Sequence, residues 1–219
     1  MPVTRKAFGR LGDGRSVDSL TLTDAQSGFF VEIIEYGATI RAIGVPRPGR
    51  DSINAVLSYP TLADYESGNA YVGATIGRCA GRTNADAHAG LRLTRNEQAN
   101  HLHGGVTGFS HSLWQTIATG DGDVPAVRLR HRSPAGEDGY PGALVVDAEF
   151  ALVASGVLRV VLEAESDADT PLSLTLHPYF NLGGDPARPI DDHLLRIDAA
   201  HILPLGPSRL PTGEMMAVD

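Results

Sequence analysis

The sequence contains a single cysteine, Cys79, among its 219 residues. One cysteine excludes a disulfide within the chain and a zinc site built from several thiolates. No apolar run approaches the roughly 20 residues that a membrane-spanning helix needs, and the first residues lead into no apolar segment typical of a secretory signal. We therefore expect a soluble, cytoplasmic protein with no membrane partner.

Basic residues are scarce as well. Lysine and arginine number 18 against 26 aspartate and glutamate residues, which gives a formal net charge of −8. This acidic balance makes nucleic acid an unfavourable partner and leaves neutral small molecules as ligands. The 25 glycines and 14 prolines argue against a helical bundle and favour many short strands joined by turns.

Alternating apolar and polar residues mark several strands. The segments 144–152 and 157–165 both alternate and are separated by Gly156, so they predict a hairpin. Further strands are expected at 29–34, 39–45 and 127–131, whereas the only helical signal is a short turn at 61–65 with Thr61 as its cap. The pattern predicts an all-β protein, a large antiparallel β-sandwich, with residues 1–219 in a single domain.

Two histidines lie two positions apart at 101 and 103, before Gly104 and Gly105. On an extended strand such residues share a face, so His101 and His103 are expected to converge on one ligand or metal. The alternative is a pair of surface histidines before a turn. A metal site that also uses His111 or His177 is possible by residue type, but no familiar ligand spacing supports it.

A third histidine closes the alternating segment 171–177. Leu172, Leu174 and Leu176 are expected to face the core, which places His177 on the polar row just before the strand-ending Pro178. A histidine with an ordinary pKa near 6.5 can donate a proton close to neutral pH. The alternative is a solvated surface histidine.

Charged residues supply two further candidates. Arg78 and Arg82 lie in a glycine-rich stretch and are able to offer forked donors to an anion or to sugar hydroxyls, or else to pair with nearby carboxylates. Glu163 and Glu165 share one strand face, as the two carboxylates of a glycoside hydrolase do, but a solvated strand face is the simpler interpretation.

Five segments, in order along the chain, together resemble one known family. They are GATIGRCAGR at 73–82, NHLHGGVTGF at 100–109, EDGYPG at 137–142, TLHPYFNL at 175–182 and PTGE at 211–214. Their order and approximate spacing are similar to those of the galactose mutarotases (aldose 1-epimerases), and the resemblance covers essentially the whole chain.

The resemblance implies an isomerase that interconverts the α and β anomers of aldohexoses such as galactose and glucose, with no cofactor and no metal. By the same resemblance His177 is the general acid, and His103 hydrogen-bonds the sugar near its ring oxygen. Arg82 binds the sugar, and Tyr179 lies in the matching substrate segment. Gly81 stands in the substrate-binding segment where many members of the family have asparagine, so a sugar contact is expected to differ there.

The resemblance also implies that the C-terminal strands of the sandwich are missing. In the family a sugar-binding aspartate and the glutamate that acts as base lie beyond the segment matched by 211–214, and neither has a counterpart in this sequence. The alternative function is therefore a non-catalytic carbohydrate-binding module, or an inactive fragment, on the same scaffold. The sequence predicts no oligomeric state.

Overall fold

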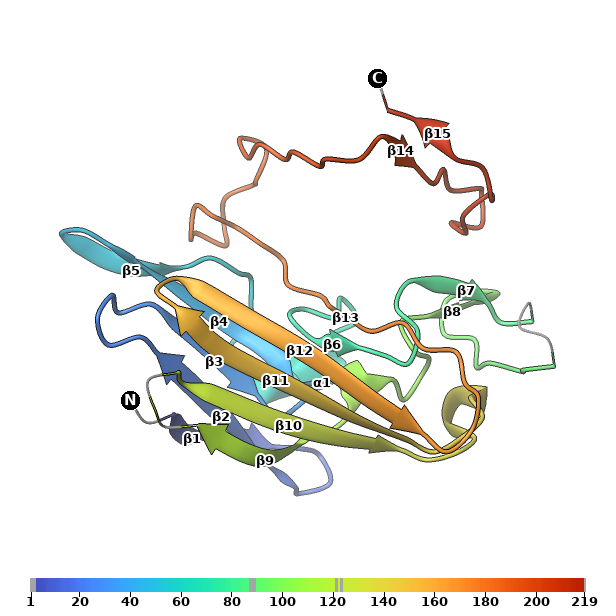
Figure 1. Cartoon of the computed structure of the whole chain (residues 1–219), viewed down its shortest axis with the longest axis horizontal. Coiled ribbons are helices and arrows are strands. Elements are labelled where there is room, and N and C mark those ends of the chain that lie inside the picture. Colours follow the sequence, from blue (N-terminus) through green and yellow to red (C-terminus); the bar gives the residue numbers. More distant parts are fainter. Residues whose placement is uncertain (1–2, 87–89, 121, 123, 219) are drawn as a thin grey trace.

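Two antiparallel sheets face each other in the computed structural model, which describes residues 3–86, 90–120, 122 and 124–218 (Figure 1). The first sheet has the order β1-β2-β3-β4-β5, with strands Thr4–Arg10, Ser16–Thr23, Phe30–Ile34, Thr39–Arg47 and Arg50–Asn54. The second has the order β12-β11-β10-β9, where β9 is Gln115–Gly120, β10 Ala126–Ser133, β11 Leu144–Ala154 and β12 Val157–Ser166. The expected all-β, antiparallel sandwich is confirmed.

The core lies between the inner faces of the two sheets. Alternate residues of β2, β3, β10 and β11 point inward and are fully or almost fully buried, among them Leu20, Leu22, Val31, Ile33, Val127, Leu129, Val146 and Phe150. The predicted β11–β12 hairpin is present, with Phe150 opposite Val160 and with Gly156 at a φ of 70° in the connecting turn. The alternation of apolar and polar residues in the sequence thus indicates which face of a strand is buried.

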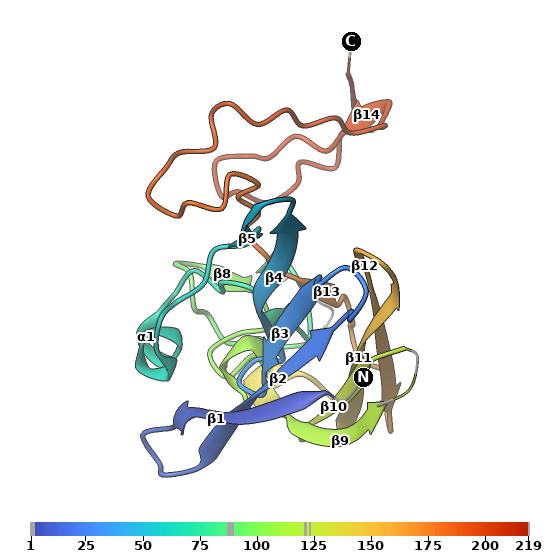
Figure 2. The same ribbon diagram turned by 90° about the vertical axis from the view of Figure 1, so that its left-hand side faces the viewer.

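A single short α-helix is described, α1 at Leu62–Ser67, beside the first sheet (Figure 2). The predicted cap is present, because the Thr61 hydroxyl accepts a hydrogen bond from the Asp64 N–H and the Asp64 carboxylate accepts one from the Thr61 N–H. Leu62 and Tyr65 are the buried residues that fasten the helix to the sandwich.

Short strand pairs at one end of the sandwich carry the candidate residues. Strand β6, Thr75–Ile76, pairs with β13, Thr175–Leu176, and β7, Arg82–Asn84, pairs with β8, Asn100–Leu102. Two 3₁₀ turns, Phe109–His111 and Glu137–Gly139, lie in the adjoining loops. The expected inward row of leucines is only partly right. Leu174 and Leu176 pack on the core, whereas Leu172 is 43% exposed.

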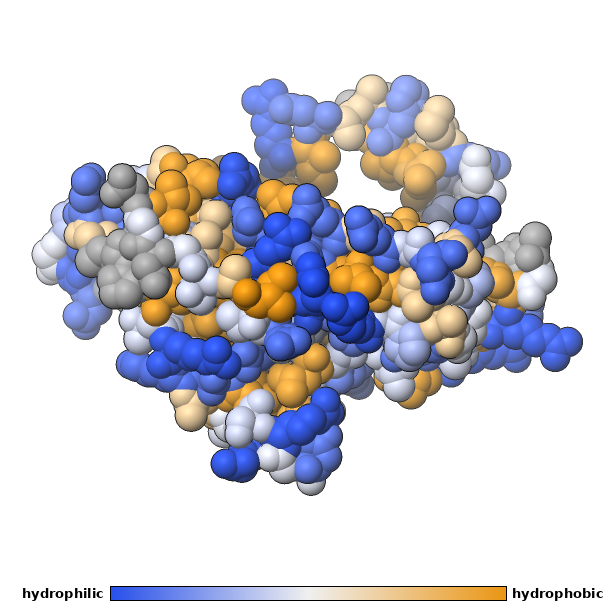
Figure 3. All heavy atoms as spheres, turned by 60° about the horizontal axis from the view of Figure 1, so that its bottom comes forward, coloured by the Kyte–Doolittle hydropathy of each residue, from blue (hydrophilic) through white to orange (hydrophobic). Residues whose placement is uncertain are grey.

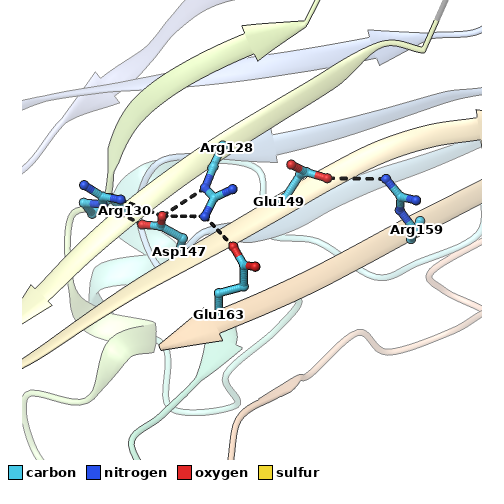
Figure 4. A network of polar contacts seen from close by, with 6 residues as sticks. All are labelled: Arg128, Arg130, Asp147, Glu149, Arg159 and Glu163. Carbon is cyan, nitrogen blue, oxygen red and sulfur yellow. Dashed lines mark hydrogen bonds and ion pairs between the residues drawn. The ribbon is translucent and has the colours of Figure 1, made fainter. Parts of the chain in front are cut away.

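The outer face of the second sheet is a network of ion pairs (Figure 4). Asp147 of β11 binds both Arg128 and Arg130 of β10, and Arg128 also binds Glu163 of β12. Glu163 is therefore one member of a solvated, charge-balanced face. The simpler interpretation of Glu163 and Glu165 holds.

The C-terminal segment, residues 182–218, stands apart from the sandwich in two views (Figures 1 and 2). Its only strands are β14, His201–Ile202, and β15, Met216–Ala217, which pair with each other. Exposed apolar side chains are frequent in it, and hydrophobic residues show as orange patches on the upper part of the molecule in Figure 3. No helix within the described ranges is long and apolar enough to span a membrane.

Candidate functional site

His103 and His177 meet at the end of the sandwich that carries the short strand pairs. Their ring centroids are 5.1 Å apart and their planes lie at 89°. His177 directly follows β13, and its N–H donates to the Ala74 carbonyl while its own carbonyl accepts from the Gly73 N–H. His103 directly follows β8, and its N–H donates to the Gly81 carbonyl. Residues 74 positions apart in sequence thus become neighbours through two separate strand pairs.

Two tyrosines complete an aromatic cluster around the histidines. The Tyr71 ring lies 4.7 Å from His103 and 6.1 Å from His177, and the Tyr179 ring lies 5.1 Å from His177. Tyr179 is 38% exposed, and its hydroxyl donates to the Ala70 carbonyl. Solvent therefore reaches the cluster beside the ring of Tyr179. Sequence reasoning gave Tyr71 no role, although it directly precedes the segment 73–82 and its φ of 55° marks a turn that aims the ring.

His103 is held in one protonation state. The Gly81 N–H donates to His103 Nδ1 at 3.1 Å, so the neutral ring carries its proton on Nε2. Burial, together with the nearby His177 and Arg82, lowers the pKa of His103 to about 4. At neutral pH this imidazole is a hydrogen-bond donor through Nε2–H. The backbone N–H of Gly81 thus orients the ring of His103. A side chain at position 81 would have open space, because an added Cβ would meet no heavy atom within 4 Å.

Arg82 lies on β7 beside the histidines and is held by a carboxylate. Its Nε donates to Glu97 Oε2 at 2.5 Å and its Nη2 donates to Glu97 Oε1 at 2.7 Å. The arginine and the glutamate are each about one quarter exposed. The hydrogen bonds from Arg82 lower the pKa of Glu97, and the charge of Glu97 acts against the lowering of the His103 pKa. Sequence reasoning missed Glu97.

Asp138 fixes the loop that presents His103. Its carboxylate accepts hydrogen bonds from the Val106 and Thr107 N–H groups and from the Thr94 and Thr107 hydroxyls. Burial opposes ionisation of Asp138, but these hydrogen bonds outweigh it and lower the pKa. Gly105 passes so close that an added Cβ would lie 2.4 Å from the Asp138 carboxylate. The turn at 137–142 thus positions the loop at 103–108.

The expectation that His101 and His103 converge is wrong. His101 is fully buried, its Nδ1 lies 2.7 Å from the Thr94 carbonyl, and its Nε2 lies 2.7 Å from the Tyr140 hydroxyl. The chain turns between the two histidines because His103 has a φ of 53°, outside the extended region. His101 is a structural residue.

Arg78 is also structural. It is 2% exposed, and its guanidinium donates to Ser133 and to the carbonyls of Pro134 and Pro141. Of the two arginines predicted as donors to a ligand, Arg82 is the one whose charge acts on the pKa of His103. Among the residues that the structure describes, no group of three or more His, Cys, Asp or Glu is arranged to hold a metal ion.

Comparisons with known proteins show which family this chain resembles. The model of the family described as aldose 1-epimerase matches residues 18–219. Galactose mutarotase of Homo sapiens is 39% identical over 225 residues, which cover 99% of this chain and 63% of the human protein. Maltose epimerase of Levilactobacillus brevis is 32% identical over 221 residues, covering 99% of this chain and 64% of that enzyme.

The fold also matches solved structures. The crystal structure of galactose 1-epimerase from Lactobacillus acidophilus NCFM superposes with a TM-score of 0.85 at 30% identity. The match covers 98% of this chain and 62% of that protein. The chain therefore spans a little under two thirds of the length of the relatives it matches.

Proposed function

This chain belongs to the aldose 1-epimerase family, and we propose that it interconverts the α and β anomers of aldohexoses such as galactose and glucose. The observation that carries the proposal is the pair of half-buried imidazoles, His103 and His177, 5.1 Å apart beside a partly exposed tyrosine. Relatives named galactose mutarotase and maltose epimerase support a sugar as the substrate.

Anomer exchange needs one proton delivered to the ring oxygen and one removed from the C1 hydroxyl. As the C1–O5 bond breaks, its electron pair takes the delivered proton and the C1 hydroxyl becomes an aldehyde. Rotation about C1–C2 and attack on the other face of the aldehyde then give the second anomer. Positioned acid and base groups contribute about 10²–10⁴-fold each to such a step, without a metal or cofactor.

The two histidines suit different parts of this step. With a pKa of about 4, His103 keeps its Nε2 proton near neutral pH and donates a hydrogen bond to the ring oxygen. We assign the delivery of the proton to the ring oxygen to His177, as the general acid, and the proton of the C1 hydroxyl passes to water. Arg82 and Tyr179 are proposed to contact the sugar hydroxyls, and Gly81 contributes by orienting His103 through its N–H.

Polarimetry of freshly dissolved α-glucose and α-galactose tests the proposal. The protein should accelerate the approach to the equilibrium rotation, and His177→Ala and His103→Ala should each remove the acceleration. His201→Ala, an exposed histidine on β14, is the matched control and should keep the wild-type rate. An unchanged rate in both site variants excludes these histidines from the reaction.

A carbohydrate-binding module is the second candidate, and one observation favours it. Glu97 is the carboxylate whose charge reaches His103, but both of its oxygens already bind Arg82. A carboxylate held in this way is a poor base for the C1 hydroxyl. Saturable binding of galactose by calorimetry, with no acceleration in the polarimeter, would select this candidate over the first.

A further inference from the structure

Glu97 is a charged side chain beside the histidines to which the proposed reaction gives no role. It lies at the end of the loop that connects β7 and β8, where its N–H donates to the Asn100 carbonyl and its carbonyl accepts from the Asn100 N–H. This turn brings the Glu97 carboxylate onto the guanidinium of Arg82. We propose that Glu97 determines substrate specificity, holding Arg82 so that the site selects neutral sugars over anionic ones.

The geometry of the pair leaves part of Arg82 available to a ligand. A guanidinium has five N–H donors in a fixed fork, and Glu97 occupies one on Nε and one on Nη2. The two donors on Nη1 and the second donor on Nη2 are not taken by Glu97. Two parallel hydrogen bonds fix the plane of the guanidinium, so these donors point in a defined direction.

The charge of the pair is the basis of the selection. The Glu97 carboxylate offsets the positive charge of Arg82 within the same partly buried pair. Arg209 also approaches Glu97, at 3.6 Å, but it is 68% exposed and solvent screens it. An anion that approaches Arg82 therefore meets a fixed negative charge beside it.

Hydroxyl groups and anionic groups differ in the hydrogen bonds that they form with Arg82 and Glu97. A sugar hydroxyl both accepts from Arg82 and donates to Glu97, so it satisfies both partners at once. A carboxylate or phosphate only accepts, so it bonds to Arg82 while its charge repels Glu97. This inference rests on the proposed sugar site, and it specifies neutral aldohexoses as the class that the site takes.

Calorimetry with galactose and galacturonic acid, which carries a carboxylate at C6, tests the inference. We expect the wild-type protein to bind galactose at least tenfold more tightly, and Glu97→Gln to shift the ratio of the two dissociation constants about tenfold toward the acid. Added salt should weaken acid binding to that variant, since the attraction is then electrostatic. Glu163→Gln removes an arginine-paired glutamate from the outer sheet face and is the matched control, which should keep the wild-type ratio.

A second variant separates charge from shape. Glu97→Asp keeps the charge on a shorter side chain, so it should retain the preference for galactose while weakening the binding of both sugars. Circular dichroism checks that each variant is folded. The inference is overturned if Glu97→Gln keeps the wild-type ratio, or if the wild-type protein binds the two sugars equally.

The outcome is distinguishable from a failure of the proposed function. Selective galactose binding without acceleration of mutarotation supports the role of Glu97 and rejects the epimerase activity. Acceleration of mutarotation with an unchanged ratio in Glu97→Gln does the reverse. Absence of galactose binding in the wild-type protein rejects both.

Discussion

The sandwich and the C-terminal segment use the same residue types in opposite ways. Leu129 in β10 is fully buried between the sheets, whereas Leu194 is fully exposed, and Leu195 and Ile197 are 85% and 70% exposed. Apolar side chains stabilise a fold only where they leave water, at about 25 cal/mol for each Å² of apolar surface buried. The stability of this chain therefore resides before residue 182, whatever the composition of the segment that follows.

The candidate site lies at the border between these regions. Asn181 is 4% exposed and Leu182 is 63% exposed, so the buried part of the chain ends within a few residues of His177 and Tyr179. His103, Tyr71 and Arg82 are all supplied by the earlier part of the chain. The histidine cluster is thus anchored mainly by the sandwich, and each prediction below tests one side of this comparison against the other.

The largest expected effect comes from the same substitution on the two sides. Leu129→Ala leaves a cavity in the core and should lower the free energy of unfolding by about 2–5 kcal/mol. Leu194→Ala removes a side chain already in water and should change it by less than about 0.5 kcal/mol. Urea unfolding followed by tryptophan fluorescence measures both, because the single Trp114 is buried in the same core. Equal losses in the free energy of unfolding would refute the conclusion that stability resides in the sandwich and not in the C-terminal segment.

The second effect is a dependence of stability on pH that comes from the sandwich. Burial, with a smaller contribution from Arg78, lowers the pKa of His131 to about 4, and the ring is packed between Phe109 and Trp114. Since the unfolded chain has the ordinary pKa near 6.5, it binds more protons between pH 6.5 and 4, and stability falls as pH falls through that range. The loss that comes from His131 alone should reach about 3 kcal/mol at pH 4 relative to pH 8.

Substitutions separate the contribution of His131 to the pH dependence of stability from the contributions of other titrating groups. His131→Phe should make the pH profile of unfolding less steep, leaving the dependence in the same direction that the pKa of His103, also about 4, produces. His201→Phe makes the same change on the exposed β14 and should leave the profile as it is in the wild-type protein. A His131→Phe profile as steep as the wild-type one contradicts the assignment.

The third effect concerns the turn that holds the loop of His103. In Asp138→Asn one oxygen becomes an N–H₂ group that faces the Thr107 N–H, so a part-buried hydrogen bond is lost and two donors face each other, and stability should fall by about 1–3 kcal/mol. Asp198→Asn, in an exposed pair with Arg196, should change stability by less than about 0.5 kcal/mol. Thermal unfolding measures both, and a neutral Asp138→Asn would show that the loop does not depend on this carboxylate.

The sequence predicts the sandwich side of the comparison well, for a physical reason. Strands β3, β4, β10, β11 and β12 each bury one face against the core, so their alternation is visible along the chain. The same rule overstates the strand at 171–176. Only Thr175 and Leu176 lie in a strand there, Ser173 forms an isolated bridge with Cys79, and Leu172 is 43% exposed.

The site is predicted in part. His177 is predicted from its place at the end of an alternating segment, and His103 from the family resemblance. The convergence of His101 with His103 fails because the rule assumes extended backbone and His103 has a positive φ. Glu97 is not visible from the sequence, since it lies 15 positions after Arg82 and most of the described residues between them belong to no strand. Such contacts depend on how a loop folds back, which no local periodicity encodes.

The smallest expected effect tests the contacts that link the C-terminal segment to the site. Arg209 pairs with Glu97 at 3.6 Å, and the Asn100 side chain donates to the Ser208 carbonyl. Because Arg209 is 68% exposed, Arg209→Ala should change the global free energy of unfolding by less than about 0.5 kcal/mol. Hydrogen exchange should nevertheless quicken in residues 205–212 and stay unchanged in β10 and β11, since the core does not feel the contact. Quicker exchange in the core strands would mean that the sandwich and the C-terminal segment unfold as one unit. The two regions would then differ in the exposure of their side chains but not in their stability.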